Sequence, residues 1–225
     1  VFAILACLLT LAGCDKQAGV VPAEGDAARP VPGDTILMGS IGEPSTLLPV
    51  LASDSASSDI NGLVYNGLVR YDKDLKIEGE LAESWEISAD NLTITFHLRK
   101  DVTWHDGQPF TAEDVLFTYR LYVDPATPTA YAESYRQVSS AEVIDAHTYR
   151  VHYEKPLATA LVSWSLPIHP RHLLEGEDIT RSPLARRPVG TGPYRFVEWA
   201  TGEKVVLESN PDYFEGPALI TVSYT

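Results

Sequence analysis

The sequence has few cysteines and few positive charges. Only two of its 225 residues are cysteine, Cys7 and Cys14, so no disulfide framework or thiol chemistry is available after the first fourteen residues. Lysine and arginine number 17 against 31 aspartates and glutamates, which gives a formal net charge of −14. The positive charges form no run longer than Arg186-Arg187. Because nucleic acid binding needs clustered positive charge to neutralise phosphates, the composition argues against a nucleic acid partner.

Common catalytic and metal-binding motifs are also missing. No His-Glu-x-x-His, Gly-x-Ser-x-Gly or Walker-type glycine loop occurs, and the six histidines are scattered. His169 and His172 are close in sequence, but zinc sites need three or four convergent ligands. His105 and Asp106 could form an acid–base pair, although an aspartate in an Asp-Gly turn more often bonds its own backbone. We therefore predict no enzymatic activity, no metal site and no cofactor.

The hydrophobic pattern predicts a mixture of helices and strands. Apolar residues make up 44% of the sequence, enough for a globular core. Helical spacing predicts a helix within 53–68, ended by Gly67, and a second helix that starts at Thr111 and stops before Pro125. Short apolar or alternating runs predict strands at 35–41, 92–98, 149–153, 194–199, 205–208 and 219–225. These elements indicate β-hairpins covered by helices.

The first residues have the pattern of an export signal. Residues 1–12 are apolar except for Thr10, but this run is shorter than the roughly 20 residues of a membrane-spanning helix. It suits the apolar region of a signal peptide, and without a starting Met or a basic region the sequence is expected to begin inside the gene product. Leu11-Ala12-Gly13-Cys14 resembles the bacterial lipobox, which implies lipidation of Cys14. The alternative is an ordinary secretory cleavage site with an incidental cysteine. Residues 15–33 are rich in Ala, Gly and Pro and predict a flexible tether.

A series of longer motifs resembles the family 5 solute-binding proteins, which serve ABC importers of peptides, nickel and related solutes. The motifs are Ile41-Gly42-Glu43-Pro44, Leu81-Ala82-Glu83-Ser84-Trp85, Phe96-His97-Leu98-Arg99-Lys100, the run WHDGQPFTAEDV at 104–115, and Gly190-Thr191-Gly192-Pro193-Tyr194. The resemblance covers the chain from Asp34 to Thr225.

This resemblance implies an α/β fold, the periplasmic-binding-protein-like two-lobed clamp of type II with an inserted subdomain. Residues 34–65 and 184–225 are expected to form part of the main lobe, and residues 66–183 the inserted subdomain. Family members are longer than this chain, so we expect it to hold only the first lobe and the insert. In such clamps the ligand lies between the lobes, and closure excludes water.

The resemblance also implies a function and a ligand site. The protein is expected to be a monomer that captures oligopeptides or dipeptides outside the inner membrane and delivers them to ABC permease subunits, held by a lipid anchor. The alternatives are a binding protein for nickel or another small solute, a sensor lipoprotein, and a lipid-anchored hydrolase. Ser53 and Ser55, in the hydroxyl-rich loop 52–58, are expected to bond the peptide backbone, or else merely to cap a helix. Tyr131 is expected to be a pocket tyrosine.

Overall fold

The computed structural model describes residues 35–40, 42–218 and 221–224, which belong to one compact unit running from Val31 to Thr225. Cys14, the other residues of the predicted signal peptide and the predicted tether at 15–33 lie outside the described residues. Within the described ranges, no helix is both long and apolar enough to cross a membrane.

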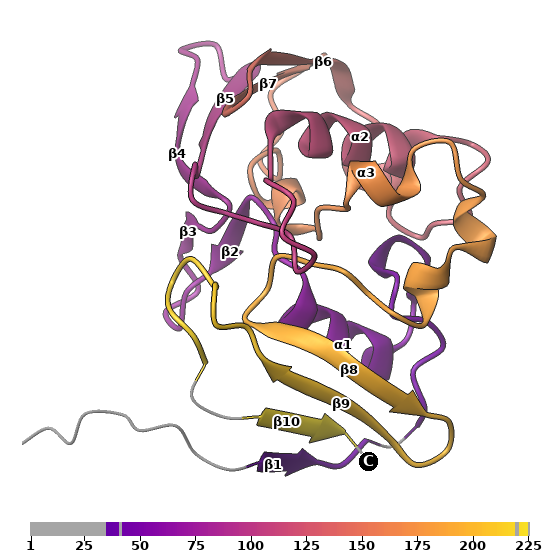
Figure 1. Ribbon diagram of the computed structural model, residues 1–225. Coiled ribbons are helices and arrows are strands. Elements are labelled where there is room, and N and C mark those ends of the chain that lie inside the picture. The colour runs from indigo at the N-terminus through magenta and orange to yellow at the C-terminus, as the bar shows by residue number, and fades with distance from the viewer. Residues whose placement is uncertain (1–34, 41, 219–220, 225) are drawn as a thin grey trace, which may run out of the picture. The chain divides into compact units, whose positions relative to one another are not determined.

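One sheet joins the beginning and the end of the described chain (Figure 1). Its strand order is β1-β10-β9-β8, where β1 and β10 are parallel and the other neighbours are antiparallel. The strands are β1 (Thr35–Met38), β8 (Tyr194–Ala200), β9 (Lys204–Ser209) and β10 (Thr221–Tyr224). The parallel pairing of β1 and β10 is possible because the long intervening chain provides the crossover that parallel strands require.

Helix α1 (Ser55–Val64) packs on this sheet and closes a first, smaller core. Ile60 and Val64 project from the helix at the i and i+4 positions of one face, and both are buried. They meet the alternate inward residues of the strands. The buried members of this cluster are Leu47, Ile60, Val64, Tyr65, Val205, Leu207, Val222 and Tyr224.

A second four-stranded sheet, with the order β4-β5-β7-β6, is antiparallel throughout. A separate hairpin is formed by β2 and β3, and helix α2 packs against β6 and β7. The elements are β2 (Val69–Tyr71), β3 (Ile77–Gly79), β4 (Ala82–Ile87), β5 (Thr93–Leu98), α2 (Ala112–Val123), β6 (Val138–Asp145) and β7 (Thr148–Tyr153). The shorter helices are η1 (Pro49–Leu51), η2 (Ala132–Tyr135), η3 (Val162–Ser165), α3 (Arg171–Leu174), η4 (Ile179–Arg181) and η5 (Pro183–Ala185).

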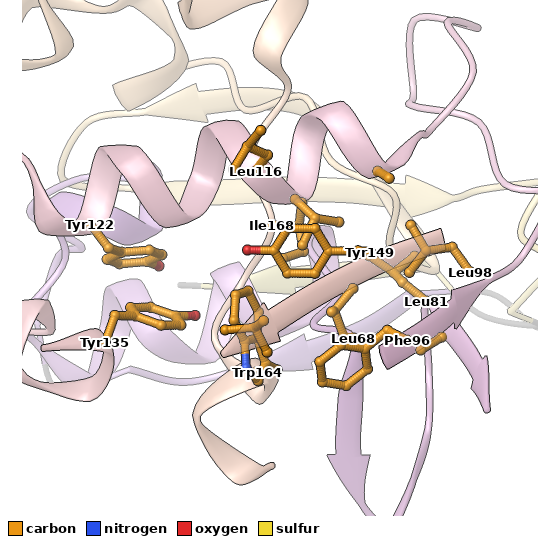
Figure 2. Close-up of a cluster of buried hydrophobic side chains, with 14 of the residues drawn as sticks. Leu68, Leu81, Phe96, Leu98, Leu116, Tyr122, Tyr135, Tyr149, Trp164 and Ile168 are labelled. Atoms are coloured by element: carbon orange, nitrogen blue, oxygen red, sulfur yellow. The ribbon is translucent and has the colours of Figure 1, made fainter. Parts of the chain in front are cut away.

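The larger core is rich in aromatic side chains, and Trp164 is central to it (Figure 2). The Trp164 ring lies 5.0 Å from Tyr135, 5.1 Å from Tyr149 and 5.7 Å from Phe96, measured between centroids. Its Nε1–H donates to the Tyr153 hydroxyl at 2.9 Å. Such tilted and edge-on contacts add specific attraction to the burial of large apolar surfaces.

The predicted strands are found as β1, β5, β7, β8, β9 and β10, and the predicted start of α2 is confirmed, whereas β2, β3, β4 and β6 were not predicted. The alternating residues of β5 and β7 are buried on one face, and the Thr111 N–H donates to Asp114 Oδ2 at 2.9 Å in the expected capping arrangement. The predicted end of the first helix is wrong, because α1 stops at Val64 and Tyr65 is already extended. Gly67 has another role, since a Cβ there would lie 2.7 Å from the Ser165 carbonyl oxygen.

Candidate ligand-binding site

A pocket of about 230 Å³ lies where the parallel strands β1 and β10 end. Ligands of open α/β sheets commonly bind outside the carboxyl ends of parallel strands. The loop after β1 supplies Glu43 and Pro44 to its lining, α1 supplies Ile60, β10 supplies Tyr224, and the β8–β9 hairpin supplies Trp199. The lining combines apolar surface with a few charged groups, which is the usual composition of a small-molecule site. The predicted ligand residues Ser53, Ser55 and Tyr131 do not line this pocket.

Trp199 is held in place from two directions. Its Nε1–H donates to Glu43 Oε1 at 2.8 Å, and the Arg186 guanidinium carbon lies 3.6 Å from the centroid of its ring. The first contact ties the β8–β9 hairpin to the loop after β1. The second is a cation–π contact. Together they fix the orientation of one wall of the pocket.

A polar cluster fixes the start of α1. Asp54 caps the helix, because its Oδ1 accepts the Ser57 N–H at 2.7 Å. Its Oδ2 accepts the hydroxyls of Ser57 and Ser45 at 2.7 and 2.5 Å. Although burial alone raises the pKa of Asp54, these hydrogen bonds from Ser45 and Ser57 bring it down to about 2. The carboxylate is thus charged at any physiological pH and anchors the loop on both sides.

Ser53 and Ser55 flank this capping aspartate and are both exposed. The structure assigns the cap to Asp54, so the alternative in which these serines cap the helix does not apply. Their predicted role in ligand binding stays a prediction. Their position next to a rigid helix start suits that role, because a hydroxyl can both donate to and accept from a peptide backbone.

Tyr131 is half-buried and lies immediately before η2. Its ring meets Tyr122 edge-on at 6.3 Å, and Tyr122 in turn meets His169 edge-on at 5.6 Å. His169 Nε2 accepts the Val50 N–H at 3.3 Å, in the η1 turn shortly before Ser53. Tyr131 is therefore connected only indirectly to the segment that contains Ser53, through the rings of Tyr122 and His169 and one hydrogen bond to Val50. Its predicted contact with ligand stays a prediction.

His105 has a structural role that the sequence did not reveal. The Gly190 N–H donates to His105 Nδ1 at 3.2 Å, which requires the proton on Nε2, and Nε2–H then donates to the Gly192 carbonyl at 3.0 Å. Burial lowers the pKa of His105 to about 4, so the ring is neutral near pH 7. Asp106 accepts the Gln108 N–H at 3.2 Å, as expected for turn chemistry. The two side chains therefore have separate roles.

A buried carboxylate, Glu80, holds a second junction. Its two oxygens accept the Asn66 side-chain amide at 2.7 Å and the Gly67 N–H at 2.8 Å. Arg70 is 3.8 Å away and also binds Glu215 at 2.8 Å. Burial raises the pKa of Glu80 to about 7 in spite of these favourable contacts. No sequence signal distinguishes Glu80 from the neighbouring exposed glutamates.

Comparison with known proteins identifies the family. Residues 76–225 match the bacterial extracellular solute-binding proteins, family 5 Middle. The chain belongs to this family. The family 5 chain is 32% identical over 231 residues to the oligopeptide-binding protein AppA of Bacillus subtilis, an alignment that covers all of this chain and 42% of AppA.

Solved structures of relatives have the same fold. The structure of Bacillus subtilis AppA in complex with a nonapeptide matches with a TM-score of 0.82 and 31% identity, over 87% of this chain and 40% of that one. NikZ of Campylobacter jejuni, in complex with Ni(L-His), matches with a TM-score of 0.79 and 30% identity, over 85% and 38%. The family 5 chain thus spans about two fifths of the length of these relatives. In the described part, no three His, Cys, Asp or Glu side chains form a group able to hold a metal ion.

Proposed function

We propose that this protein is the substrate-binding component of an ABC importer, that it captures peptides outside the cytoplasmic membrane, and that it delivers them to the permease. The observation that carries the proposal is the similarity of the whole chain to the oligopeptide-binding protein AppA. The fold supports it further, since the structure of AppA with a nonapeptide has the same architecture over 87% of this chain.

In this proposal the peptide backbone lies along the start of α1, past Ser53 in the preceding loop and Ser55 in the first helical turn. Both serines are exposed, while Asp54 between them is fully used in holding the helix start. The helix start therefore offers hydrogen-bonding groups from a fixed backbone, which suits recognition that is indifferent to the peptide sequence. Tyr131 contributes an aromatic wall. Binding needs no covalent step, and the protein is not an enzyme.

The domain division predicted from the sequence is part of the proposal. Residues 34–65 and 184–225 belong to a main lobe, and residues 66–183 form an inserted subdomain. The smaller hydrophobic cluster supports this division, because all its buried residues lie within 34–65 and 184–225, on α1 and the β1-β10-β9-β8 sheet. The larger cluster is built mainly on the β4-β5-β7-β6 sheet but also includes Leu48, Val50 and Leu184 from the main lobe. A second lobe in the full-length protein closes over the ligand and excludes water.

The protein acts as a monomer held at the membrane by a lipid on Cys14. Two or three acyl chains anchor a protein durably, because each buried methylene contributes about 0.8 kcal/mol. Replacing Cys14 with Ala should release the full-length protein from the membrane fraction into the soluble extracytoplasmic fraction. A Cys14→Ala protein that remains in the membrane fraction contradicts the anchor.

The peptide function is tested by thermal unfolding of the full-length protein with candidate ligands. Peptides of two to nine residues should raise the midpoint, since saturation at about 100 times Kd stabilises by roughly 2.7 kcal/mol. Ser53→Ala with Ser55→Ala should weaken this shift, whereas Ser58→Ala, whose hydroxyl bonds the Asp54 carbonyl at 2.9 Å, serves as the control. Release of cleaved peptide would indicate the rival hydrolase.

The alternative ligand is a nickel complex, which the match to NikZ with Ni(L-His) favours. If Ni²⁺ with histidine raises the unfolding midpoint and peptides do not, the ligand is a nickel complex and the peptide assignment is wrong. A sensor lipoprotein would bind ligand equally well but would have no permease. Genes for a permease and an ATPase beside this gene support the importer.

A further inference from the structure

Arg186-Arg187 is one of two adjacent pairs of positive charge in this acidic chain, the other being Arg99-Lys100, and both of its side chains are exposed. The backbone that carries them is well held. The Leu47 N–H donates to the Ala185 carbonyl at 2.8 Å, and the Arg187 N–H donates to the Pro183 carbonyl at 3.0 Å. The two guanidinium groups are therefore presented from a fixed segment.

This pair borders a groove of about 610 Å³, which we call the β8 groove. Its lining is Arg186, Arg187 and the β8 residues 196–199. The groove shares only Trp199 with the pocket at the ends of β1 and β10. Val197 is 48% exposed, so the groove offers apolar contact as well as charge. None of its lining residues belongs to the segment 53–58, so it is a surface distinct from the proposed peptide site.

The charges in the β8 groove are unbalanced. Glu198 is already paired with Lys204, at 2.6 Å. Arg186 is stacked on Trp199 and donates to the neutral Thr201 hydroxyl at 2.5 Å. Among the described residues, no ion pair joins either arginine of the pair to a carboxylate. On a chain with a net charge of −14, the groove is thus a local positive site that complements an anionic partner.

Strand β8 is also an edge of its sheet in the part of the chain that the structure describes (Figure 1). On such an edge, backbone N–H and C=O groups point away from the neighbouring strand. Seven residues of strand extend about 23 Å, enough for a segment of similar length to lie alongside. The β8–β9 register shifts between Phe196 and Glu198, so a partner strand pairs with β8 on either side of this irregularity rather than continuously.

We propose that the β8 groove docks an extended acidic segment of a partner protein. The row of backbone groups on β8 is matched by another polypeptide backbone and not by a membrane or a nucleic acid. Arg186 and Arg187 then bind the carboxylates of that segment, and Val197 packs against its apolar residues. The overall charge of −14 works against any large polyanion that must approach the rest of the surface.

The probe for this surface is a fluorescently labelled peptide of alternating valine and glutamate with blocked ends, added to the full-length protein at low ionic strength. Fluorescence anisotropy gives the affinity. The double variant with Arg186→Glu and Arg187→Glu should bind the valine–glutamate peptide at least about tenfold more weakly. It should bind the matching valine–lysine peptide more tightly than the natural protein does. Arg187→Glu alone leaves the Arg186 stack in place and should still weaken binding. Arg181→Glu, an equally charged change at a side chain that is 87% exposed, should have little effect.

Amide hydrogen exchange locates the bound peptide. Slower exchange in residues 194–200 supports the proposal. Protection confined to residues 53–58 places the acidic peptide in the proposed ligand site, which supports peptide binding but overturns the docking surface. Absence of binding, insensitivity to the arginine substitutions, or equal protection of β8 by inorganic phosphate or anionic vesicles also overturns it.

Discussion

Replacing Glu80 with Gln should change how the stability of the protein depends on pH. The Glu80 side chain is 12% exposed, accepts hydrogen bonds from Asn66 and Gly67, and lies 3.8 Å from Arg70. Glu78 and Glu215 bind the same guanidinium, so three carboxylates share one cation. Burial therefore dominates, and it raises the pKa of Glu80 from its usual 4.5 to about 7.

The sign of the effect follows from proton linkage. Between pH 4.5 and about 7 the folded protein keeps the proton on Glu80, while the unfolded chain has released it. The contribution of Glu80 to the free energy of unfolding is therefore full below pH 4.5 and declines as pH rises to 7. At about 1.4 kcal/mol per pH unit, the decline amounts to about 3 kcal/mol.

Two buried histidines oppose this trend in part of the same range. Burial lowers the pKa of His105 to about 4 and that of His169 to about 3, so both remove stability as pH falls below 6.5. The informative quantity is consequently the difference between the Glu80→Gln protein and the natural protein. That difference should change by about 3 kcal/mol between pH 5 and pH 8, because the variant cannot titrate at this position.

Urea unfolding followed by tryptophan fluorescence at pH 5, 6, 7 and 8 gives the required free energies. Glu78→Gln is the matched control, because Glu78 binds the same arginine at 2.8 Å but its side chain is 44% exposed. It should leave the pH dependence almost unchanged. If the natural and Glu80→Gln proteins have parallel pH profiles, burial does not control the protonation of Glu80 and the reasoning is refuted.

Three further predictions concern α1 and the segment that contacts its end. Asp54→Ala should lower the free energy of unfolding by about 1 kcal/mol at pH 7, because the helix cap is lost. Urea unfolding should show a smaller loss near pH 2, because the pKa of Asp54 is about 2 and the natural carboxylate is then partly protonated. Gly190→Ala should destabilise the protein by about 1–3 kcal/mol, because a Cβ there overlaps the Val64 carbonyl. Gly62→Ala, in open space within α1, should stabilise the protein by about 1 kcal/mol. Thermal melts compare the two variants, and equal effects would contradict the packing argument. His105 should stay neutral between pH 6 and pH 8, with its proton on Nε2 in nitrogen-15 NMR spectra, and an imidazolium signal at pH 6 would contradict this assignment.

Local sequence patterns predicted the elements that bury one face. Strands β5 and β7 alternate strictly, and α2 begins with a capping sequence, so their positions follow from nearest-neighbour chemistry. Strands β4 and β6 were not predicted from periodicity. Both lie at the edges of their sheet and carry exposed polar residues, and they form because β5 and β7 offer backbone groups to pair with.

The sequence predicts features of the candidate site only where a residue contacts its neighbours in the chain. The hydroxyl-rich segment 52–58 is evident from the sequence; Ser53, Ser55 and Ser58 in it are exposed, and its role in binding stays a prediction. The residue that caps α1 is ambiguous in the sequence, because Ser53, Asp54 and Ser55 can all accept hydrogen bonds from the first backbone amides. In the structure Asp54 is the cap, and Ser45, nine residues earlier, also donates to its carboxylate. His105 depends on Gly190, 85 residues later, and Glu80 shares Arg70 with Glu215, which is far along the chain. Sequence periodicity carries no information about such contacts.

Helix α1 connects the proposed ligand loop to these distant contacts. Its first turn is held by Asp54 next to the exposed serines, and its last residue, Val64, accepts the Gly192 N–H at 2.8 Å. Thr191, between the two glycines, donates to the Asn66 side chain at 2.9 Å, and Asn66 donates to Glu80. These hydrogen bonds connect Glu80 to the C-terminal end of α1, at the opposite end of the helix from the exposed serines. A helix packed in a core shifts as a whole or not at all. Substitutions of Glu80 should therefore change the free energy of unfolding more than they change the affinity for ligand.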